Sequence, residues 1–503
     1  MSKLKANFKI GLFSIITFIF IVLLLARPPW DPDLGWHLRN GQDILRFGVP
    51  KGDLYSHTMF GYPWISHEWL TDVLLYLSTH YLGLVFLSLV FALIAFFAYF
   101  ISARVAKVRI ESTLITVLIA ALVALPIVGI RPQMLTLLGL AIVLWILFRW
   151  RDNPQSRLIY WLIPLMLVWV NMHGGFAAGL ILMGVFGAIE LIKYLFKRFK
   201  VIKIVNLTMS PVQLWELAGV GIISFAVTFI NPYTWRIYDE LFRTVFNDLV
   251  RQGISEWLPV TFSNPQSYNL VIYIVFIAVL LIFSWKKVDS TKVWIGAVFL
   301  LISLSSWRNM PLFPLVTLPL LSEMIEALSP KGIYYHLRSV WMIGLAVILL
   351  VYVGYDRYYT VVPLSINEAL FSTMQGYPYN AIQYIKENKL PGKMFNEYNW
   401  GGYLIWRLPE KKVFIDGRMA IWQTEDQNIF EEYLVLSGAI ANVSTIDEDK
   451  TAILDKYEID LALIYRNRSF KNYFLSHNDK WTLVYGDSLA LIFQRIDSIN
   501  DVN

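Results

Sequence analysis

Eleven apolar segments dominate this sequence and restrict what it can fold into. They are residues 10–26, 83–103, 112–130, 132–148, 158–172, 174–189, 217–230, 269–284, 293–306, 311–321 and 340–354, and none contains Asp, Glu, Lys or Arg. A helix that crosses a bilayer needs about 20 predominantly apolar residues. Only 16% of the residues are charged, against about 25% in soluble domains. We therefore predict a polytopic α-helical membrane protein with about 11 transmembrane helices.

The charges between these segments predict an orientation. Three lysines precede the first segment, which we expect to be retained because it is long for a signal peptide and lacks a small-x-small cleavage site. The positive-inside rule then places the N-terminus in the cytoplasm. Alternate loops are basic, as this orientation requires: they carry Arg104, Lys107 and Arg109; Arg149, Arg151 and Arg157; Lys193, Lys197, Arg198, Lys200 and Lys203; Lys286, Lys287 and Lys292; Lys331 and Arg338. We predict a multi-pass protein of the cell (inner) membrane whose C-terminal domain is extracytoplasmic.

The composition excludes several classes of chemistry. There is no cysteine, so the chain has no disulfide, thiolate nucleophile or cysteine-ligated metal. The net charge of +6 reflects the basic inner loops and gives no reason to expect nucleic acid as a partner. An ion-coupled transporter usually keeps ionisable groups near the middle of the membrane. Since the apolar segments have none, we expect the chemistry at the outer surface.

The first outer loop, residues 27–82, holds the most concentrated group of polar side chains near the start of the chain. Asp31 and Asp33 form a DxD motif directly after the first predicted span. Two carboxylates at this spacing can share a divalent cation such as Mg²⁺ or Mn²⁺, or one can act as a general base on a hydroxyl. Alternatively, Asp33 only caps the helix that begins at Leu34. We predict that both carboxylates are catalytic and that they are the ligands of any metal.

Other polar residues recur at the predicted outer ends of the helices. Arg131, His173 and Arg308, with His37 and Arg39 in the first loop, are the candidates to bind a phosphate. The alternative for the arginines is contact with lipid headgroups, and for His173 a structural role at a helix end. The remaining candidates are His67, Glu68 and Glu256. For the two glutamates, substrate binding competes with a favourable position near a helix N-terminus.

The composition becomes that of a water-soluble domain near Tyr377. We predict strands at 393–395, 412–415, 460–465, 481–485 and 489–494 and helices at 381–388 and 452–457. The interleaving of helices and strands is typical of a small α/β domain. We assign residues 1–355 to a transmembrane domain and 356–503 to this C-terminal domain, in which WGG (400–402) and DGR (416–418) look least like packing residues.

The chain resembles a family of prokaryotic membrane proteins placed with the GT-C-fold glycosyltransferases, beside protein mannosyltransferases and the lipid A aminoarabinose transferase. The resemblance covers nearly the whole chain. It rests on DPDLGWHLRNG and WISHEWL, then RPQ, NMHGGF, NPY, SEWLP and RN, and finally YNWGGYLIWRLPEKKVFIDGRM. It implies a donor in which a hexosyl or pentosyl group is linked to polyprenyl phosphate, used outside the cytoplasm with inversion at the anomeric carbon.

The same resemblance implies roles for particular residues. Asp31 and Asp33 match the first-loop acidic motif, and Arg131, His173 and Arg308 match phosphate binders by position. A second acidic motif is absent unless Glu68 or Glu256 supplies it. The implied partners are the lipid-linked donor, membrane lipids and a lipid, glycan or protein acceptor. Two alternatives stay open: a transporter or flippase of lipid-linked glycans, and a non-catalytic scaffold of envelope assembly.

Overall fold

The structure is a computed structural model that describes residues 2–29, 31–199, 208–328, 340–363, 368–438 and 447–500. Internal contacts divide the chain into two compact units. The first unit consists of Met1–Pro28, Val85–Ile237 and Ile254–Val362. The second consists of Pro29–Leu84, Tyr238–Gly253 and Pro363–Asn503. Each unit is therefore assembled from segments that are far apart in the sequence.

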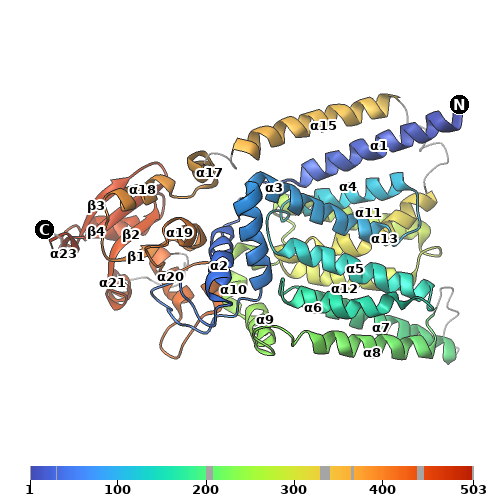
Figure 1. The fold of residues 1–503 in the computed structure, drawn as a ribbon, viewed down its shortest axis with the longest axis horizontal. Coiled ribbons are helices and arrows are strands. Elements are labelled where there is room, and N and C mark those ends of the chain that lie inside the picture. The colour runs from blue at the N-terminus through green and yellow to red at the C-terminus, as the bar shows by residue number, and fades with distance from the viewer. Residues whose placement is uncertain are drawn as a thin grey trace. The chain divides into compact units, whose positions relative to one another are not determined.

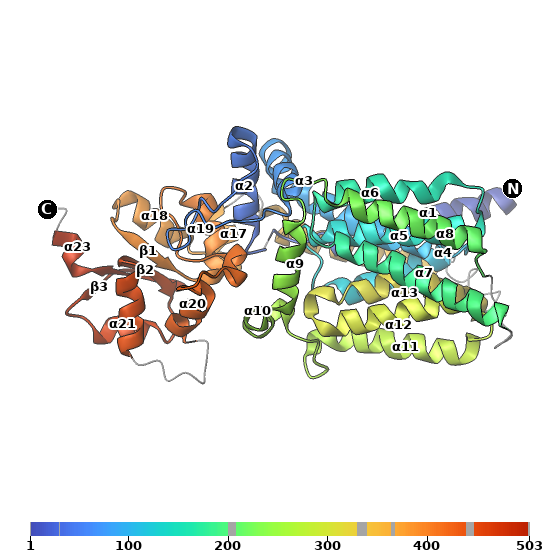
Figure 2. The same cartoon turned by 90° about the horizontal axis from the view of Figure 1, so that it is seen from below.

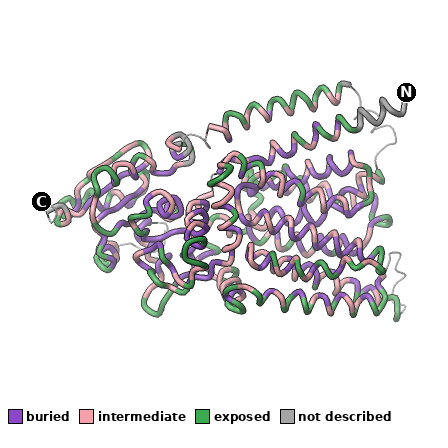
Figure 3. The backbone as a smooth tube through the Cα atoms, viewed as in Figure 1, coloured by how far each residue is buried: buried purple, intermediate pink, exposed green. Residues whose placement is uncertain are grey.

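The first unit is a bundle of apolar helices (Figures 1 and 2). It contains α1 (Ser2–Leu25), the second half of α3 (Trp69–Ala103), α4 (Ile110–Ala124), α5 (Gln133–Asp152), η1 (Arg157–Trp161), α6 (Leu162–Val170), α7 (Phe176–Arg198), α8 (Pro211–Val227), η2 (Ser255–Trp257), η3 (Pro265–Ser267), α11 (Tyr268–Ser284), α12 (Ser290–Ser305), η4 (Trp307–Asn309), α13 (Leu312–Leu328) and α15 (Val340–Thr360). α5 and α13 are mostly buried, whereas α15 is mainly apolar and has hardly any buried residue, its positions being exposed or intermediate (Figure 3). Such exposed apolar faces suit contact with lipid.

Within the part of the chain that the structure describes, six helices are long and apolar enough to cross a membrane: Trp69–Ala103, Gln133–Asp152, Phe176–Arg198, Pro265–Ser284, Trp307–Leu328 and Trp341–Thr360. Five shorter apolar helices lie at Gly11–Leu25, Ile110–Ala124, Arg157–Val170, Pro211–Val227 and Ser290–Ser305. Each of these helices coincides with one of the segments predicted from sequence. The helical class of the first unit is thus confirmed, and the total of about 11 spans stays a prediction.

A break at Gly83 divides α3 into two helices. Gly83 has φ +79°, a left-handed value inside an otherwise helical stretch that favours glycine because it has no Cβ. The part before the break belongs to the second unit and the part after it to the first. This agrees with the sequence prediction of an apolar segment that begins at residue 83.

The second unit combines the first outer loop with the C-terminal segment (Figure 1). Its helices are α2 (Leu34–Phe47), the first half of α3, most of α9 (Arg236–Phe246), α10 (Asp248–Gly253), α17 (Glu368–Gln375), α18 (Tyr379–Glu387), η5 (Tyr398–Trp400), α19 (Gly401–Arg407), η6 (Gly417–Ile421), α20 (Ile429–Ser437), α21 (Asp447–Lys456), α22 (Lys471–Ser476) and α23 (Ile496–Asn500). Contacts place loop 27–82 mainly in this unit, whereas the sequence analysis assigned it to the membrane domain 1–355.

A four-stranded mixed sheet forms the core of the C-terminal segment. The strands β1 (Lys393–Asn396), β2 (Ile459–Tyr465), β3 (Trp481–Gly486) and β4 (Ala490–Arg495) lie in the order β1-β2-β4-β3. β1 is parallel to β2, and β4 is antiparallel to both β2 and β3. Four of the five predicted strands and both predicted helices are confirmed. The prediction of a strand at 412–415 is wrong, because that segment forms an isolated bridge between Val413 and Ser56 of the outer loop.

Glycines bring the outer loop against the C-terminal segment. A Cβ on Gly35 of α2 would lie 2.2 Å from the carbonyl oxygen of Gly402 in α19, and a Cβ on Gly402 would lie 2.3 Å from that of Pro32. The backbones of α2 and α19 therefore touch, and any side chain there would push them apart. Leu34 and Leu38 of α2 are buried within the second unit.

Candidate functional site

The DxD carboxylates lie at the start of α2. The backbone N–H of Asp33 donates to Oδ1 of Asp31 at 2.9 Å, which fixes the turn between them. Asp33 occupies the N-cap position of α2, but its side chain makes no capping hydrogen bond. Its carboxylate instead lies against Gly417, where a Cβ would be 1.9 Å from Asp33 Oδ1. The cap interpretation of Asp33 therefore has no hydrogen bond to support it.

A cavity of about 250 Å³ lies beside Asp31 within the second unit. Its lining comes from α2, the first half of α3, α17, α19 and the turns beside them. The lining residues include Asp31, Tyr377, Tyr403 and Trp406. Burial, together with the charges of Asp31 and Asp33, raises the pKa of Tyr377 well above its usual value. Tyr377 therefore stays a neutral phenol beside the two carboxylates, and a substrate group in this cavity would lie beside Asp31.

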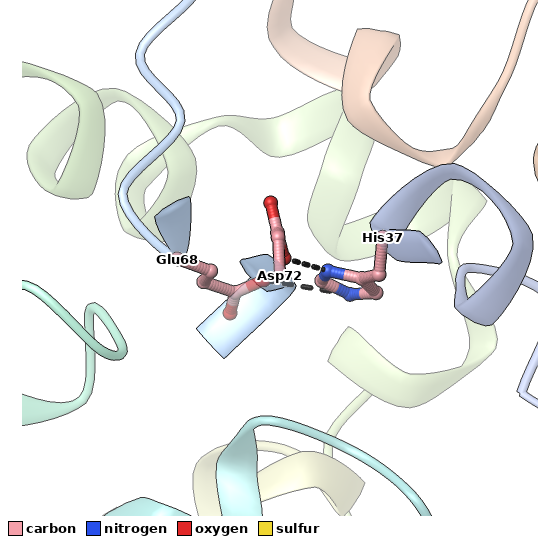
Figure 4. A group of neighbouring side chains, drawn as sticks. All are labelled: His37, Glu68 and Asp72. Atoms are coloured by element: carbon pink, nitrogen blue, oxygen red, sulfur yellow. Dashed lines mark hydrogen bonds and ion pairs between the residues drawn. The ribbon is translucent and has the colours of Figure 1, made fainter. Parts of the chain in front are cut away.

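A buried polar cluster fixes α2 against the first half of α3. His37 Nδ1 donates to Asp72 Oδ1 at 2.6 Å, and His37 Nε2 lies 3.5 Å from Glu68 Oε2 (Figure 4). Asn40 Nδ2 donates to the other Asp72 oxygen at 2.6 Å. Burial disfavours the imidazolium, but the charges of Asp72 and Glu68 outweigh burial and raise the pKa of His37 to about 9. His37 is thus a buried cation between two carboxylates.

This cluster bears directly on the predicted metal site. Among the described residues, His37, Glu68 and Asp72 form a group of three potential ligands within 4.8 Å of one another, and Asp31 and Asp33 belong to no such group. A metal requires histidine in its neutral form. Because both ring nitrogens of His37 face carboxylates, the group fits a protonated histidine better than a metal. Divalent metal binding by Asp31 and Asp33 stays a prediction.

Two other candidates in the first loop, Arg39 and His67, contact acidic side chains. Arg39 donates from Nε to Asp43 Oδ2 at 2.9 Å along α2, and Asp43 also accepts from the Tyr55 hydroxyl at 3.0 Å. His67 Nε2 lies 3.6 Å from Glu68 Oε1 and is about one third exposed. The structure thus places Glu68 between His37 and His67. Arg39 contacts Asp43 and not this group.

The DGR motif joins the outer loop to the C-terminal segment. The Arg418 guanidinium is buried and donates to Asp416 at 2.6 Å and to Asp53 of the outer loop at 2.9 Å. It also lies over the rings of Tyr55, Trp64 and Trp422. These contacts make Arg418 a structural cation, and Gly417 leaves the space that Asp33 occupies. The sequence analysis predicted that this motif would not have a packing role. That prediction is wrong for Arg418, which is buried and paired with two aspartates.

Three candidate residues, Arg131, Glu256 and Arg308, lie in the first unit. Arg131 forms an ion pair with Glu256, so part of its charge is compensated. The Arg308 guanidinium lies 5.4 Å from the centre of the Trp257 ring, next to Glu256 in sequence. The Gln133 carboxamide is within hydrogen-bond distance of Arg308. The pairing of Arg131 with Glu256 was not foreseen from the sequence, and a role of these residues in substrate binding stays a prediction.

His173 has contacts that explain it structurally. The backbone N–H of Gly175 donates to His173 Nδ1 at 2.9 Å, and the Thr136 hydroxyl lies 2.6 Å from the same nitrogen. Because a backbone N–H can only donate, Nδ1 must be an acceptor. A Cβ on Gly175 would lie 2.0 Å from Thr136 Oγ1. His173 therefore shapes the turn before α7, and a role in phosphate binding stays a prediction.

Sequence reasoning missed Asp72, Asn40 and the cavity residues Tyr403, Trp406 and Arg407. One signal was present: Glu68 and Asp72 are four residues apart, and His37 and Asn40 three apart, so each pair shares one face of a helix. Tyr403, Trp406 and Arg407 also share one face of a helix by their spacing, but no local pattern shows that α19 contacts α2, the contact that brings them to Asp31.

Comparisons with known proteins give a likeness of structure. No protein-family model matches the chain, and no curated protein matches it. The structure is similar to that of the archaeal oligosaccharyltransferase AglB from Archaeoglobus fulgidus in complex with an inhibitory peptide and a dolichol-phosphate, with a TM-score of 0.56 and 12% identity over 92% of this chain and 70% of that chain. The apo form of the A. fulgidus oligosaccharyltransferase gives a TM-score of 0.54 with the same identity and coverage. The predicted resemblance is thus confirmed at the level of fold, and the chain has the GT-C fold of these oligosaccharyltransferases.

Proposed function

We propose that this protein is a membrane glycosyltransferase that moves a sugar from a polyprenyl-phosphate-linked donor to an acceptor on the outer side of the membrane, with inversion. The observation that carries the proposal is the GT-C fold, matched over 92% of the chain. The archaeal structure with this fold contains a dolichol-phosphate, which supports a lipid-linked donor here. The carboxylates Asp31 and Asp33, together with the cavity beside Asp31, supply the polar groups that such a transfer needs.

The transfer is a single displacement. An oxygen of the acceptor hydroxyl attacks the anomeric carbon, while the bond from that carbon to the phosphate oxygen breaks. The acceptor proton goes to a carboxylate, for which Asp33 is our choice and Asp31 its neighbour. The electron pair leaves with the polyprenyl phosphate, whose developing charge an arginine would stabilise. The sugar is a hexosyl or pentosyl group, and the acceptor is a lipid, glycan or protein.

The proposed membrane placement follows from the alternating basic loops. The N-terminus is cytoplasmic, and the second unit, with Asp31 and Asp33, is extracytoplasmic. A lipid donor enters from the bilayer, so a site near the end of the first span suits it. If a divalent cation is required, Asp31 and Asp33 would hold it, and it would supply positive charge to the site.

The direct test is a transfer assay with the purified protein in lipid nanodiscs. The probes are polyprenyl phosphates that carry glucose, mannose, N-acetylglucosamine, galactose or arabinose, offered with an extract of envelope glycans and lipids. We expect release of polyprenyl phosphate that depends on both donor and acceptor. The assay is run with and without Mg²⁺ or Mn²⁺ to measure metal dependence. Acceptor-independent binding with flipping of the donor across the bilayer would instead support the flippase alternative.

Arg308 is the better of the two arginine candidates for the donor phosphate, because Arg131 already has Glu256 as its ion-pair partner. We predict that Arg308→Ala raises the KM for the donor about 10- to 100-fold, since loss of a charge-assisted contact costs about 1.5–3 kcal/mol and about 1.4 kcal/mol is a factor of ten. Donor titration in the nanodisc assay measures this.

The matched control is Arg46→Ala, which removes an exposed arginine at the end of α2. It should leave the KM unchanged. Wild-type donor affinity in Arg308→Ala would show that this arginine is a headgroup anchor.

A further inference from the structure

The cavity of about 250 Å³ in the second unit has a lining that no proposed step above explains. Its walls include Glu368 and Arg407 as well as Asp31, Tyr377, Tyr403 and Trp406. Pockets for drug-sized ligands measure about 300–1,000 Å³. A cavity slightly smaller than this range holds about one six-membered ring with its substituents, so the bound group is small and compact.

The aromatic side chains of the lining are held in place. Tyr377 and Tyr403 stack with their ring centres 4.6 Å apart and their planes at 16°. The Tyr403 hydroxyl is 2.7 Å from Ser372 Oγ and donates to Glu368 Oε1 at 3.2 Å. Trp406 is partly exposed and is one of the residues that line the cavity. Rigid aromatic surfaces beside hydrogen-bonding groups suit a ring that has both apolar faces and polar edges.

The polar groups are oriented for hydrogen bonding. Arg407 Nε forms an ion pair with Glu368 Oε1 at 2.5 Å, which leaves the pair at the edge of the cavity, each about one third exposed. Thr79 also lines the cavity, and its buried hydroxyl has no hydrogen-bond partner among the described residues. A buried hydroxyl without a partner is costly, and a ligand that bonds to it removes that cost.

The charges of the lining select the class of ligand. Asp31 and Glu368 are negative and Arg407 is positive, so the lining carries more negative than positive charge. A phosphate would be repelled by the two carboxylates. An uncharged ring with hydroxyl groups is not repelled in this way. Its hydroxyls can donate hydrogen bonds to the carboxylates, and its oxygens can accept hydrogen bonds from the arginine. The donor phosphate therefore belongs elsewhere.

We propose that this cavity binds an uncharged, hydroxyl-bearing sugar ring of the acceptor, with one face on Trp406 and with its hydroxyls bonded to Glu368, Arg407 and Thr79. The assignment of the ring to the acceptor, as opposed to any other glycan, rests on the proposed function. The acceptor is then a glycan or a glycosylated molecule, since a ring beside Asp31 places a hydroxyl near the DxD carboxylates.

The test measures binding without turnover. The full-length protein in nanodiscs is titrated with methyl glycosides of glucose, mannose, N-acetylglucosamine, galactose and arabinose, and with the same sugars as 1-phosphates, while ligand resonances are followed by saturation-transfer NMR. We expect at least one methyl glycoside to receive saturation on its ring protons, and each 1-phosphate to bind more weakly than its methyl glycoside. Trp406→Ala and Glu368→Gln should each weaken this binding at least tenfold, with a melting temperature near that of the wild type.

Asp33→Asn distinguishes this proposal from the proposed function. That variant should lose transfer yet bind the glycosides as the wild type does, because Asp33 does not line the cavity. Ring binding in a protein that has no transferase activity would retain the cavity as a sugar site while removing the enzyme assignment. The proposal is overturned if the wild type binds none of the methyl glycosides, if Trp406→Ala and Glu368→Gln both bind as the wild type does, or if the 1-phosphates bind more tightly.

Discussion

Asp33→Asn should lower turnover by about 10²–10⁴ while expression and melting temperature stay near wild type. The substitution keeps the shape of the side chain and removes its basicity, so it acts on proton transfer from the acceptor. The carboxylate does not serve as a hydrogen-bonding cap of α2, and Asn caps a helix about as well as Asp in any case. The measurement is kcat in the nanodisc assay together with thermal unfolding of the same preparation.

Asp31→Asn is the comparison that separates the two carboxylates. Asp31 orients the turn by accepting the Asp33 N–H, and the amide oxygen of Asn can still accept it. If Asp33 were only a cap, Asp33→Asn would be nearly silent and Asp33→Ala would destabilise the protein by about 1 kcal/mol. Full activity of both Asn variants would remove the main support for an enzyme.

Arg418→Leu should destabilise the second unit by about 3–5 kcal/mol, because removing the cation leaves the carboxylates of Asp53 and Asp416 buried without their partner. Both aspartates are fully buried, and the Arg418 side chain is 2% exposed. The loss also removes the ion pair with Asp53, one of several contacts between the outer loop and the C-terminal segment. Chemical denaturation followed by tryptophan fluorescence measures this, since Trp64 and Trp422 lie against the guanidinium.

Arg407→Leu is the matched control for this prediction. Arg407 pairs with Glu368, but both side chains are about one third exposed, and exposed pairs contribute about 0–1 kcal/mol. We expect a small change in the free energy of unfolding. Equal effects of the two substitutions would contradict the role given to Arg418.

The helical part of the fold could be predicted because bilayer thickness sets one length scale for every span. Residues 83–103 illustrate this: the sequence places the start of the span at Gly83, and the structure has a left-handed φ there. The strands could also be predicted where a short apolar run occurs in the soluble segment, as at residues 461–464 of β2, which are all buried. Residues 412–415 look like a strand by the same criteria, yet they form an isolated bridge between Val413 and Ser56, which a local pattern cannot reveal.

The site could be predicted only where the chemistry is local in sequence. Asp31 and Asp33 are two residues apart and follow a span, so their pattern is visible. Arg418 and Asp53 are 365 residues apart, and nothing near either residue announces the other. The cavity that Asp31 and α19 line could not be predicted for the same reason, because its residues are far apart in the sequence. They come together where Gly35 and Gly402 let the backbones of α2 and α19 touch.

The central claim is that this membrane protein adds sugar to an envelope component by means of its first-loop carboxylates. The most direct measurement is mass spectrometry of envelope glycans from a deletion strain, complemented with either the wild-type gene or Asp33→Asn at equal protein level. We predict that one glycan loses one sugar unit in the deletion strain, that the wild type restores it, and that Asp33→Asn does not. Identical glycans in the deletion strain and its parent, or full restoration by Asp33→Asn, would contradict the account.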